Sequence, residues 1–426
     1  MKKIILSTVA ITTLALTGAN ADTGSDIAAM KVMMKEMSQR LAKLEAENKQ
    51  LKATKKHYTT KKQHKAQKLT PKQSTKLAKL EEKVNVLEKK SEKETPVFSK
   101  ASKLKFSGLT YFGYTNTDYE NGSESGNDFA IRRAYLQLKA YLMDDPKSYY
   151  RITFDLDKDG TGDEKVRAKY AYVYLNDILP YTGVEVGIAH RPWHDYEEHN
   201  AWYYRNISKV LVENRNGAHL SNSADFGTMF KTKTKYFDAD YGIFSGEGYH
   251  GDQNKNGLSF EWRATAHLLG VSGKDKQTSK TYFDASFFGQ LNKEHKSVDV
   301  GTAVEDQDLN FYGFHTVYNQ PEFLLSAQYI YSDNTSDILG NISKQAGEGY
   351  SVNGEYRLGE DKQYRLLARY DSWTPEASDL EQKTLIAGVA WEQYSNLQWV
   401  ANVTKTNNTN SGDDTTKLML TTEIRF

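Results

Sequence analysis

Two acidic stretches of the chain begin with the residue spacing of a calcium-binding loop. The first reads DLDKDG over Asp155–Gly160, and the second reads DQNKNG over Asp252–Gly257. An EF-hand loop also needs a bidentate glutamate at its twelfth position. Val166 and Arg263 stand at that position here. We therefore interpret both stretches as acidic hairpin loops, with a weak divalent-ion site as the alternative.

Histidine and carboxylate side chains also crowd residues 190–199, HRPWHDYEEH. Imidazole and carboxylate groups are metal ligands, so a metal site is one interpretation of this stretch. A polar loop that enters a pore is the other, and we favour it. The sequence has no Gly-x-Ser-x-Gly elbow and no evident Ser-His-Asp arrangement. Without a nucleophile to start from, we predict no enzyme, no cofactor and no metal.

Positively charged side chains recur in segments where apolar and polar residues alternate. Asp128–Asp145 is the clearest of these segments, and Tyr149–Asp157 and Leu258–Leu269 repeat its pattern. A period of two predicts a strand with one apolar and one polar face. Ten-residue strands of this kind span a lipid bilayer when the polar face lines a water-filled lumen. The lumen-facing cations that alternation proposes are Arg133, Lys139, Arg151 and Arg263.

Further alternating segments follow along the chain, as a closed sheet of many strands requires. They are Tyr282–Leu291, Asn310–Tyr318, Phe323–Tyr331, Tyr350–Leu358, Tyr364–Tyr370, Leu385–Tyr394 and Leu397–Thr404. A β-sandwich alternates too, but a lumen tolerates arginine and lysine in mid-strand. The length from residue 106 onward suits about 16 strands, the size of a porin. The inward face of one strand stays open, because Lys165, Arg167 and Lys169 share a face with the apolar Ala171 and Val173.

The last twelve residues, TTKLMLTTEIRF, form one more alternating segment, and it ends on Phe426. In an outer-membrane barrel the last strand pairs with the first, so that no edge is left open in lipid. We predict that this strand closes the barrel and that Phe426 marks it for the assembly machinery. Lys417, Glu423 and Arg425 are then candidates for the lumen or its rim.

The N-terminal part of the chain has a different composition. Residues 1–21 combine a basic start, an apolar run and the small residues Ala19 and Ala21, which predicts a signal peptide. The 426 residues include no cysteine, so disulfides are excluded. Residues 22–105 carry a balance of +12, whereas residues 106–426 carry −13, which implies two environments.

Residues 22–103 are expected to form a periplasmic segment. Apolar residues from Ile27 to Leu51 alternate steps of three and four, which predicts an α-helical coiled coil. Asn48 falls at an a-type position, where a buried amide fixes register or oligomer state. A single amphipathic helix is the alternative. Lys52–Lys76 then reads as a solvated basic linker that could touch anionic polymers of the cell wall.

Residues 104–426 resemble the phosphate-selective porins of the O and P type. The stretches that carry the resemblance are DFAIRRAYLQLKAYL, VEVGIAHRPW, ADYGIFSGEGYHGDQNKNG, GYSVNGEYRLGEDKQYRLLARYDSW and the terminal EIRF. The resemblance implies a 16-stranded, usually trimeric barrel, with an inward-folded constriction loop and basic side chains that lead anions through. By the match, Arg191 begins that loop. Arg132 is expected at a rim, because it stands just before the clear part of its strand. The family's lysine clusters and arginine ladders have no residue-by-residue match here.

From these observations we predict an all-β transmembrane antiparallel barrel of the bacterial outer membrane, preceded by the periplasmic coiled segment. Its function would be passive diffusion of small hydrophilic solutes, with a preference for anions such as phosphate. The predicted contacts of the pore with anions are Arg133, Lys139, Arg151, Arg191 and Arg263. A homotrimer in outer-membrane lipid is expected, and nucleic acid is not expected as a partner. The alternatives are a general or cation-selective porin, and an outer-membrane anchor whose coiled segment binds peptidoglycan.

Overall fold

The computed structural model describes most of the predicted barrel. It covers residues 103–120, 125–141, 143–158, 161–251, 257–270, 280–299, 304–333, 346–375, 381–408 and 414–426. The predicted signal peptide, the coiled segment with Asn48 and the linker lie outside these residues. No helix in the described part of the chain has the length and apolar composition of a membrane span.

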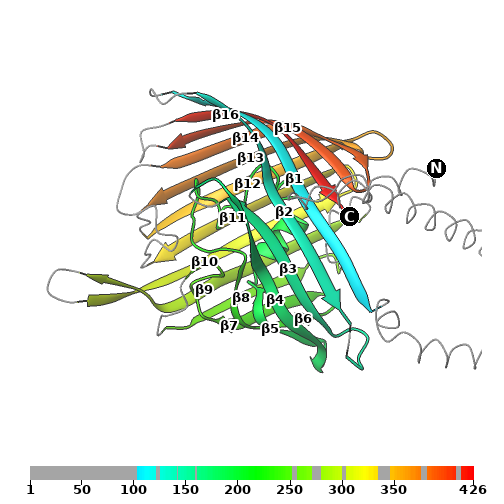
Figure 1. Cartoon of the computed structure of the whole chain (residues 1–426), viewed down its shortest axis with the longest axis vertical. Helices are drawn as coiled ribbons and strands as arrows, with labels where there is room; N and C mark the ends of the chain where they lie inside the picture. Colours follow the sequence, from blue (N-terminus) through cyan, green and yellow to red (C-terminus); the bar gives the residue numbers. More distant parts are fainter. Residues whose placement is uncertain are drawn as a thin grey trace, which may run out of the picture. The chain divides into compact units, whose positions relative to one another are not determined.

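The described residues contain sixteen antiparallel strands that close into a barrel (Figure 1). Each strand pairs with its neighbours in sequence, and β1 pairs with β16. The predicted all-β barrel and its closing strand are therefore confirmed. The strands are β1 Leu104–Tyr119, β2 Gly126–Ala140, β3 Tyr149–Lys158, β4 Glu164–Leu179, β5 Thr182–His190, β6 Ala224–Lys233, β7 Phe237–Phe244, β8 Ser259–His267, β9 Tyr282–Asp299, β10 Val304–Gln320, β11 Phe323–Asp333, β12 Gly347–Leu358, β13 Tyr364–Pro375, β14 Gln382–Tyr394, β15 Leu397–Asn408 and β16 Thr415–Arg425.

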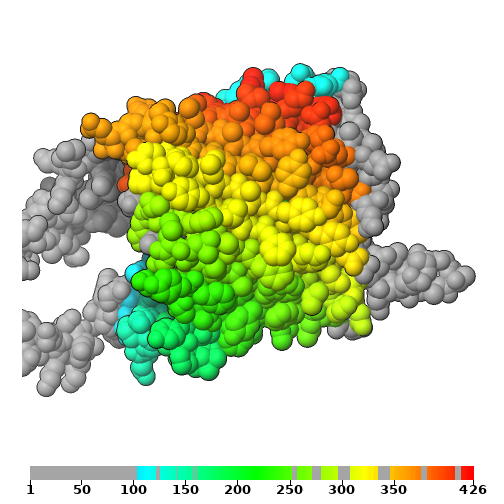
Figure 2. All heavy atoms as spheres, turned by 180° about the vertical axis from the view of Figure 1, so that it is seen from behind, coloured from blue at the N-terminus to red at the C-terminus, as the bar shows by residue number. Residues whose placement is uncertain are grey.

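The alternation in sequence becomes two faces of the barrel wall. On β8, Phe260 is 45% exposed on the outside, whereas Glu261 and Arg263 are 4% and 3% exposed on the inside. An apolar outer face with a polar interior is the arrangement that lipid on one side and water on the other require. Figure 2 shows one outer face of the barrel, where the atoms coloured green, yellow and orange follow one another in sequence order.

Two β-bulges interrupt the alternation next to β1 and β3. Tyr111 of β1 opposes Arg133 of β2. The next residue of β1, Phe112, opposes Ile131, so Arg132 of β2 has no partner in the register. In the same way, Thr153 of β3 opposes Tyr170 of β4, and the next residue of β3, Phe154, opposes Ala168. Lys169 of β4 is therefore unopposed. A bulge adds one residue to one strand and changes the direction of the side chains beside it. Both unopposed residues are cations.

The two ends of the barrel differ in their connections. We call the edge where β1 begins and β16 ends the terminus end, and the opposite edge the loop end. The chain after β5 leaves from the loop end and returns as β6 only at Ala224. Residues 191–223, which we call the inward segment, contain one short helix, α4, His194–Asn200. Its side chains contact several strands across the lumen, as described next.

Candidate pore constriction

The inward segment is held against one side of the barrel interior by aromatic packing. The ring of Trp193 stacks on that of Phe288 of β9, with 3.7 Å between the centroids and 4° between the planes. The hydroxyl of Tyr196 donates to Asp284 of β9 at 2.8 Å, and that of Tyr204 donates to Glu355 of β12. Much of the segment is buried, which gives the lumen a hydrophobic core of its own.

Polar side chains of the wall fix the rest of the inward segment. Arg369 of β13 donates to the carbonyl oxygen of Lys209 at 3.0 Å, and its guanidinium lies 4.8 Å from the centroid of Trp202. The amide of Asn206 donates to the hydroxyl of Thr421 of β16 at 3.0 Å. These contacts join the segment to the wall at several separate strands, so it is docked as a unit and does not hang free in the lumen.

Two cavities lie between the inward segment and the wall. The terminus-side cavity, about 370 Å³, is lined by residues near the start of β1 and the end of β16. The loop-side cavity, about 440 Å³, is lined by residues near the starts of β2 and β16. Tyr111 of β1 and Arg205 of the inward segment line both cavities. These two side chains therefore lie between the two cavities, at a place that we call the junction.

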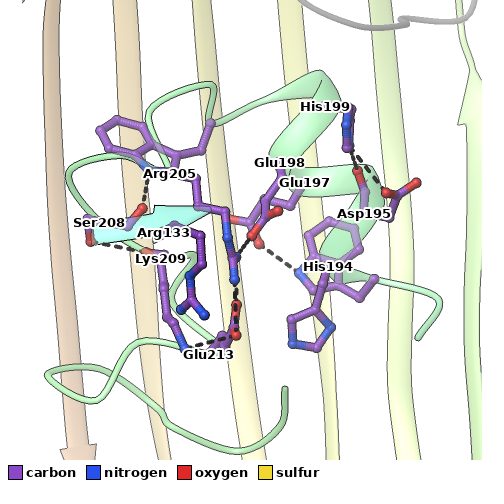
Figure 3. Close-up of polar contacts among 12 residues, drawn as sticks. Arg133, His194, Asp195, Glu197, Glu198, His199, Arg205, Ser208, Lys209 and Glu213 are labelled. Atoms are coloured by element: carbon purple, nitrogen blue, oxygen red, sulfur yellow. Dashed lines mark hydrogen bonds and ion pairs between the residues drawn. The ribbon is translucent and has the colours of Figure 1, made fainter. Parts of the chain in front are cut away.

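Arg205 is held at this junction by two carboxylates of its own segment (Figure 3). Its Nη1 pairs with Glu198 and lies 2.8 Å from Oε2 of Glu213. Lys209 also pairs with Glu213, at 3.0 Å. Burial alone would raise the pKa of Glu213, but Arg205 and Lys209 outweigh it and hold that pKa well below its ordinary value. Glu213 is thus an anion that neutralises cations of the segment.

The wall opposite Arg205 carries cations on β2, β3 and β4. We call these the basic wall, and they are Arg132, Arg133, Arg151 and Lys169. Of these four cations, Arg133 alone has an ion pair with a carboxylate among the described residues, at 2.8 Å from Asp155. Tyrosines take the place of carboxylates beside Lys169 and Arg151: Lys169 donates to the hydroxyl of Tyr135 at 3.0 Å. The guanidinium of Arg151 lies 4.7 Å from the centroid of Tyr170, a cation–π contact.

The far wall carries buried arginines that are paired. Arg263 of β8 lies 2.6 Å from Asp240, Arg369 lies 2.8 Å from Asp371, and Arg357 of β12 pairs with Glu355. Each such carboxylate offsets the charge of its partner. The uncompensated positive charge of the lumen is therefore concentrated on the basic wall.

Some of the predicted pore residues lie on or near the basic wall, and the others are buried arginines paired with carboxylates. Arg133 and Arg151 belong to the basic wall, and Lys139 lies nearby, with its ammonium 4.6 Å from the centroid of Tyr149. Arg191 is the first residue after β5, where the constriction loop was expected to begin. It is buried, however, and pairs with Glu261, as Arg263 pairs with Asp240.

The two bulges explain the positions of side chains that the alternating pattern did not predict. Arg132, expected at a rim, lines the loop-side cavity and donates to the hydroxyl of Thr115 at 3.0 Å. The bulge at Lys169 shifts the inward face of β4, so that Arg167 before it and Tyr172 after it contact Asp155 and Arg151 inside the lumen. Arg205 was missed entirely, because the irregular segment around it has no period that would show where a side chain points.

The acidic and histidine-rich stretches take structural positions. Asp155 contacts both Arg133 and Arg167, and residues 252–256 lie outside the described part of the chain. Burial lowers the pKa of His194 to about 3, so this histidine of the inward segment is neutral. No group of three or more histidine and acidic side chains among the described residues is arranged to hold a metal ion.

No protein-family model and no curated protein matches this sequence. Solved structures do match, and the anion-selective porin from Comamonas acidovorans is one of them. Its TM-score is 0.55 at 13% identity, over 76% of this chain and 99% of that chain. The chain has the fold of the bacterial porins.

Two more structures support the assignment of a porin fold. OmpT of Vibrio cholerae, in a trimer form, has a TM-score of 0.51 at 14% identity, over 76% of this chain and 99% of that chain. Salmonella typhi OmpF in complex with daunomycin has a TM-score of 0.52 at 12% identity, over 76% of this chain and 97% of that chain. Identities this low establish the porin fold alone, and the phosphate-selective type is not among these structures.

Proposed function

We propose that this protein is an outer-membrane porin through which small hydrophilic solutes diffuse passively, with a preference for anions. The porin fold and the two cavities that meet at Arg205 support the channel. One observation supports the preference: Arg132, Arg151 and Lys169 of the basic wall have no ion pair with a carboxylate among the described residues, whereas the arginines of the far wall do. A solute in the lumen meets the basic wall, because the inward segment covers the far wall.

The basic wall would act by replacing water around a passing anion. Guanidinium and ammonium groups donate charge-assisted hydrogen bonds, and several sites of moderate strength let an ion enter and leave. From the loop end, an anion would meet Arg132 and Arg133, pass Arg205 and Tyr111, and reach Lys169 and Arg151. The net negative charge of the barrel sequence does not oppose this route, because charge close to the path outweighs distant charge under screening.

The rival function within transport is a general or cation-selective pore. The carboxylates of the inward segment would have to attract cations for that function. Glu198 and Glu213 are paired with Arg205, and Asp195 lies 3.4 Å from His199, which offsets its charge only when protonated. The geometry therefore favours the anion route.

The test is the reversal potential of the purified full-length protein in planar bilayers under a potassium chloride gradient. We expect a reversal potential whose sign indicates a preference for chloride. In the double variant Arg151→Gln, Lys169→Gln the reversal potential should be smaller. Lys405→Gln is the matched control, because Lys405 is exposed on β15 and paired with Glu120. Cation preference in the wild-type protein would overturn the proposed selectivity.

We also propose a homotrimer, since one protein of this fold has a trimer form. Cross-linking of the purified protein in detergent tests it, and a product no larger than a monomer would contradict it. The periplasmic segment 22–103, the register role of Asn48 and contact with peptidoglycan stay predictions from sequence. Retention of the full-length protein on purified peptidoglycan, lost when residues 22–103 are deleted, is the outcome expected of the anchor alternative.

A further inference from the structure

Arg132 of β2 and Lys417 of β16 both line the loop-side cavity, on either side of β1. Arg132 donates to Thr115 of β1, and Lys417 opposes Thr117 of β1 in the register. Thr115 and Thr117 are two apart and share a face, so both cations lie on the side of the wall that faces this cavity. Neither cation has an ion pair with a carboxylate among the described residues. Two cations close together in a confined space repel each other unless an anion lies between them.

The bulge in the backbone of β2 sets the direction of the Arg132 side chain. Arg132 is the unopposed residue of the β2 bulge, so it points into the lumen together with Arg133. Its side chain crosses Gly113 of β1: a Cβ atom added there would lie 2.7 Å from Cδ of Arg132. A glycine at this place in β1 leaves room for the arginine, which a larger residue would displace.

The opposite side of the loop-side cavity is rich in neutral hydrogen-bonding groups, besides Arg205 and Lys209. Amide and hydroxyl side chains of the inward segment and of β14 and β15 line it: Asn206, Asn214, Asn216, Thr384, Thr404 and Thr406. The Oδ1 atom of Asn206 is buried and has no hydrogen-bond partner among the described residues. Such groups suit the hydroxyls of a sugar, and about 440 Å³ exceeds what a bare phosphate ion fills.

The cavity also contains groups that modify its charge. Asp128 and Glu164 line it, against the cations Arg132, Arg133, Lys158, Arg205, Lys209 and Lys417. The excess is positive, and Arg133, Arg205 and Lys209 already have carboxylate partners elsewhere. Arg132, Lys158 and Lys417 remain without an ion pair among the described residues, and Arg132 and Lys417 are the two of these on the strands that flank β1.

We propose that the loop-side cavity is a binding site for an anionic sugar, such as a sugar phosphate. Arg132, Lys417 and Thr115 hold the charged group, since a guanidinium, an ammonium and a hydroxyl match the acceptors of a phosphoryl group. The amide and hydroxyl side chains opposite hold the sugar. This deepens the proposed anion-preferring pore by naming a solute class that dwells in it.

The experiment is block of the chloride current of the full-length protein in planar bilayers. Glucose 6-phosphate is the probe, and inorganic phosphate and glucose are the comparison solutes. We expect glucose 6-phosphate to block at a lower concentration than either. Arg132→Gln and Lys417→Gln should each raise the blocking concentration roughly tenfold, as the loss of one charge-assisted hydrogen bond implies. Lys405→Gln on the outer wall should leave it unchanged.

Gly113→Ala tests the geometry without changing any charge. It should displace Arg132 and weaken the block, whereas Gly126→Ala should not, because a Cβ atom at Gly126 has no neighbour within 4 Å. Equal block by inorganic phosphate would overturn the sugar part of the proposal, and equal block in the wild-type and Arg132 variants would overturn the site. The reversal potential under potassium chloride is measured separately, so a cation-preferring pore that still shows the Arg132-dependent block would refute the proposed selectivity alone.

Discussion

Gly108 and Phe426 exchange two backbone hydrogen bonds where the barrel closes. The amide of Gly108 donates to the carbonyl oxygen of Phe426 at 2.9 Å, and the amide of Phe426 donates back at 3.1 Å. The ring of Phe426 lies over the glycine, and a Cβ atom added to Gly108 would come within 2.0 Å of its Cζ. The terminal aromatic ring thus covers the glycine of the neighbouring strand, at the seam between the two ends of the barrel.

Gly108→Val should loosen this seam, because the added side chain displaces the ring of Phe426. Because the ring is 68% exposed and can turn aside, the cost should lie at the low end of the range of about 1–3 kcal/mol that overpacking causes in a core. The temperature at which the folded barrel loses its faster mobility on gels is the measurement, and it should fall. Gly126→Val is the control, since space around Gly126 is open; an equal loss in both variants would refute the packing role of the ring.

Deletion of Phe426 should reduce the amount of barrel in the outer membrane, since we propose that the terminal aromatic residue is an assembly signal. It also removes the last pair of hydrogen bonds to Gly108. Yield in outer-membrane fractions is the readout. Phe426→Tyr keeps both the backbone pairing and an aromatic ring, so it should assemble like the wild type. Undiminished yield after the deletion would contradict the proposed signal.

Arg205→Gln should move the selectivity of the pore toward cations. The substitution leaves Glu198 and Glu213 without the guanidinium that pairs with both. Glu198, which lines the terminus-side cavity, is then uncompensated, and Glu213 keeps only Lys209 as a partner. The shift is measured as a change in reversal potential, and Glu198→Gln with Glu213→Gln added to Arg205→Gln should restore the wild-type sign. No shift would mean that solutes do not pass this junction.

Arg369→Leu should release the inward segment from the far wall. The variant loses the hydrogen bond to the carbonyl of Lys209 and the contact with Trp202, and it leaves Asp371 buried without its partner. Breaking a buried pair in this way costs about 3–5 kcal/mol. Faster proteolysis within residues 191–223 is the expected result. The double variant with Asp371→Leu should recover part of the stability, because the buried charge is gone.

Docking of the inward segment should also weaken as pH rises toward 7. Glu197 of α4 is buried, accepts a hydrogen bond from Trp193 at 2.8 Å, and is also contacted by Gln328. Burial raises the pKa of Glu197 to about 7 from an ordinary 4.5. A carboxyl whose pKa is raised by folding contributes stability below its ordinary pKa, and that contribution is lost as pH rises through the raised value. Protection of residues 191–223 from protease at pH 5 and pH 8 measures this, and Glu197→Gln should remove the difference.

Most of the barrel follows from the sequence because a period of two is a local property. The faces of β8 could be assigned from Phe260, Glu261 and Arg263 alone, since no bulge interrupts that strand. The terminal strand could be assigned to closure because an open edge in lipid has no partner for its backbone groups. Each of these inferences needs only neighbouring residues and a solvent on each side.

The candidate site was harder to predict because it depends on exceptions to that period. Arg132 and Lys169 fall at bulges, and a bulge is set by how a strand pairs, which neighbouring residues do not reveal. Arg205 points to the junction because its whole segment is docked by distant strands, through Tyr204 and Glu355 for example. The pairing of Arg191 and Arg263 with carboxylates also joins residues far apart in sequence.

The two bulges have a consequence for how such a pore can evolve. Each bulge places a single cation in the lumen. The number of strands is unchanged, and the strands pair regularly on both sides of the bulge. One inserted or deleted codon is therefore a unit of heritable change in the charge of the channel. A lineage could retune what its pore admits by such small steps, without rebuilding the barrel that surrounds it.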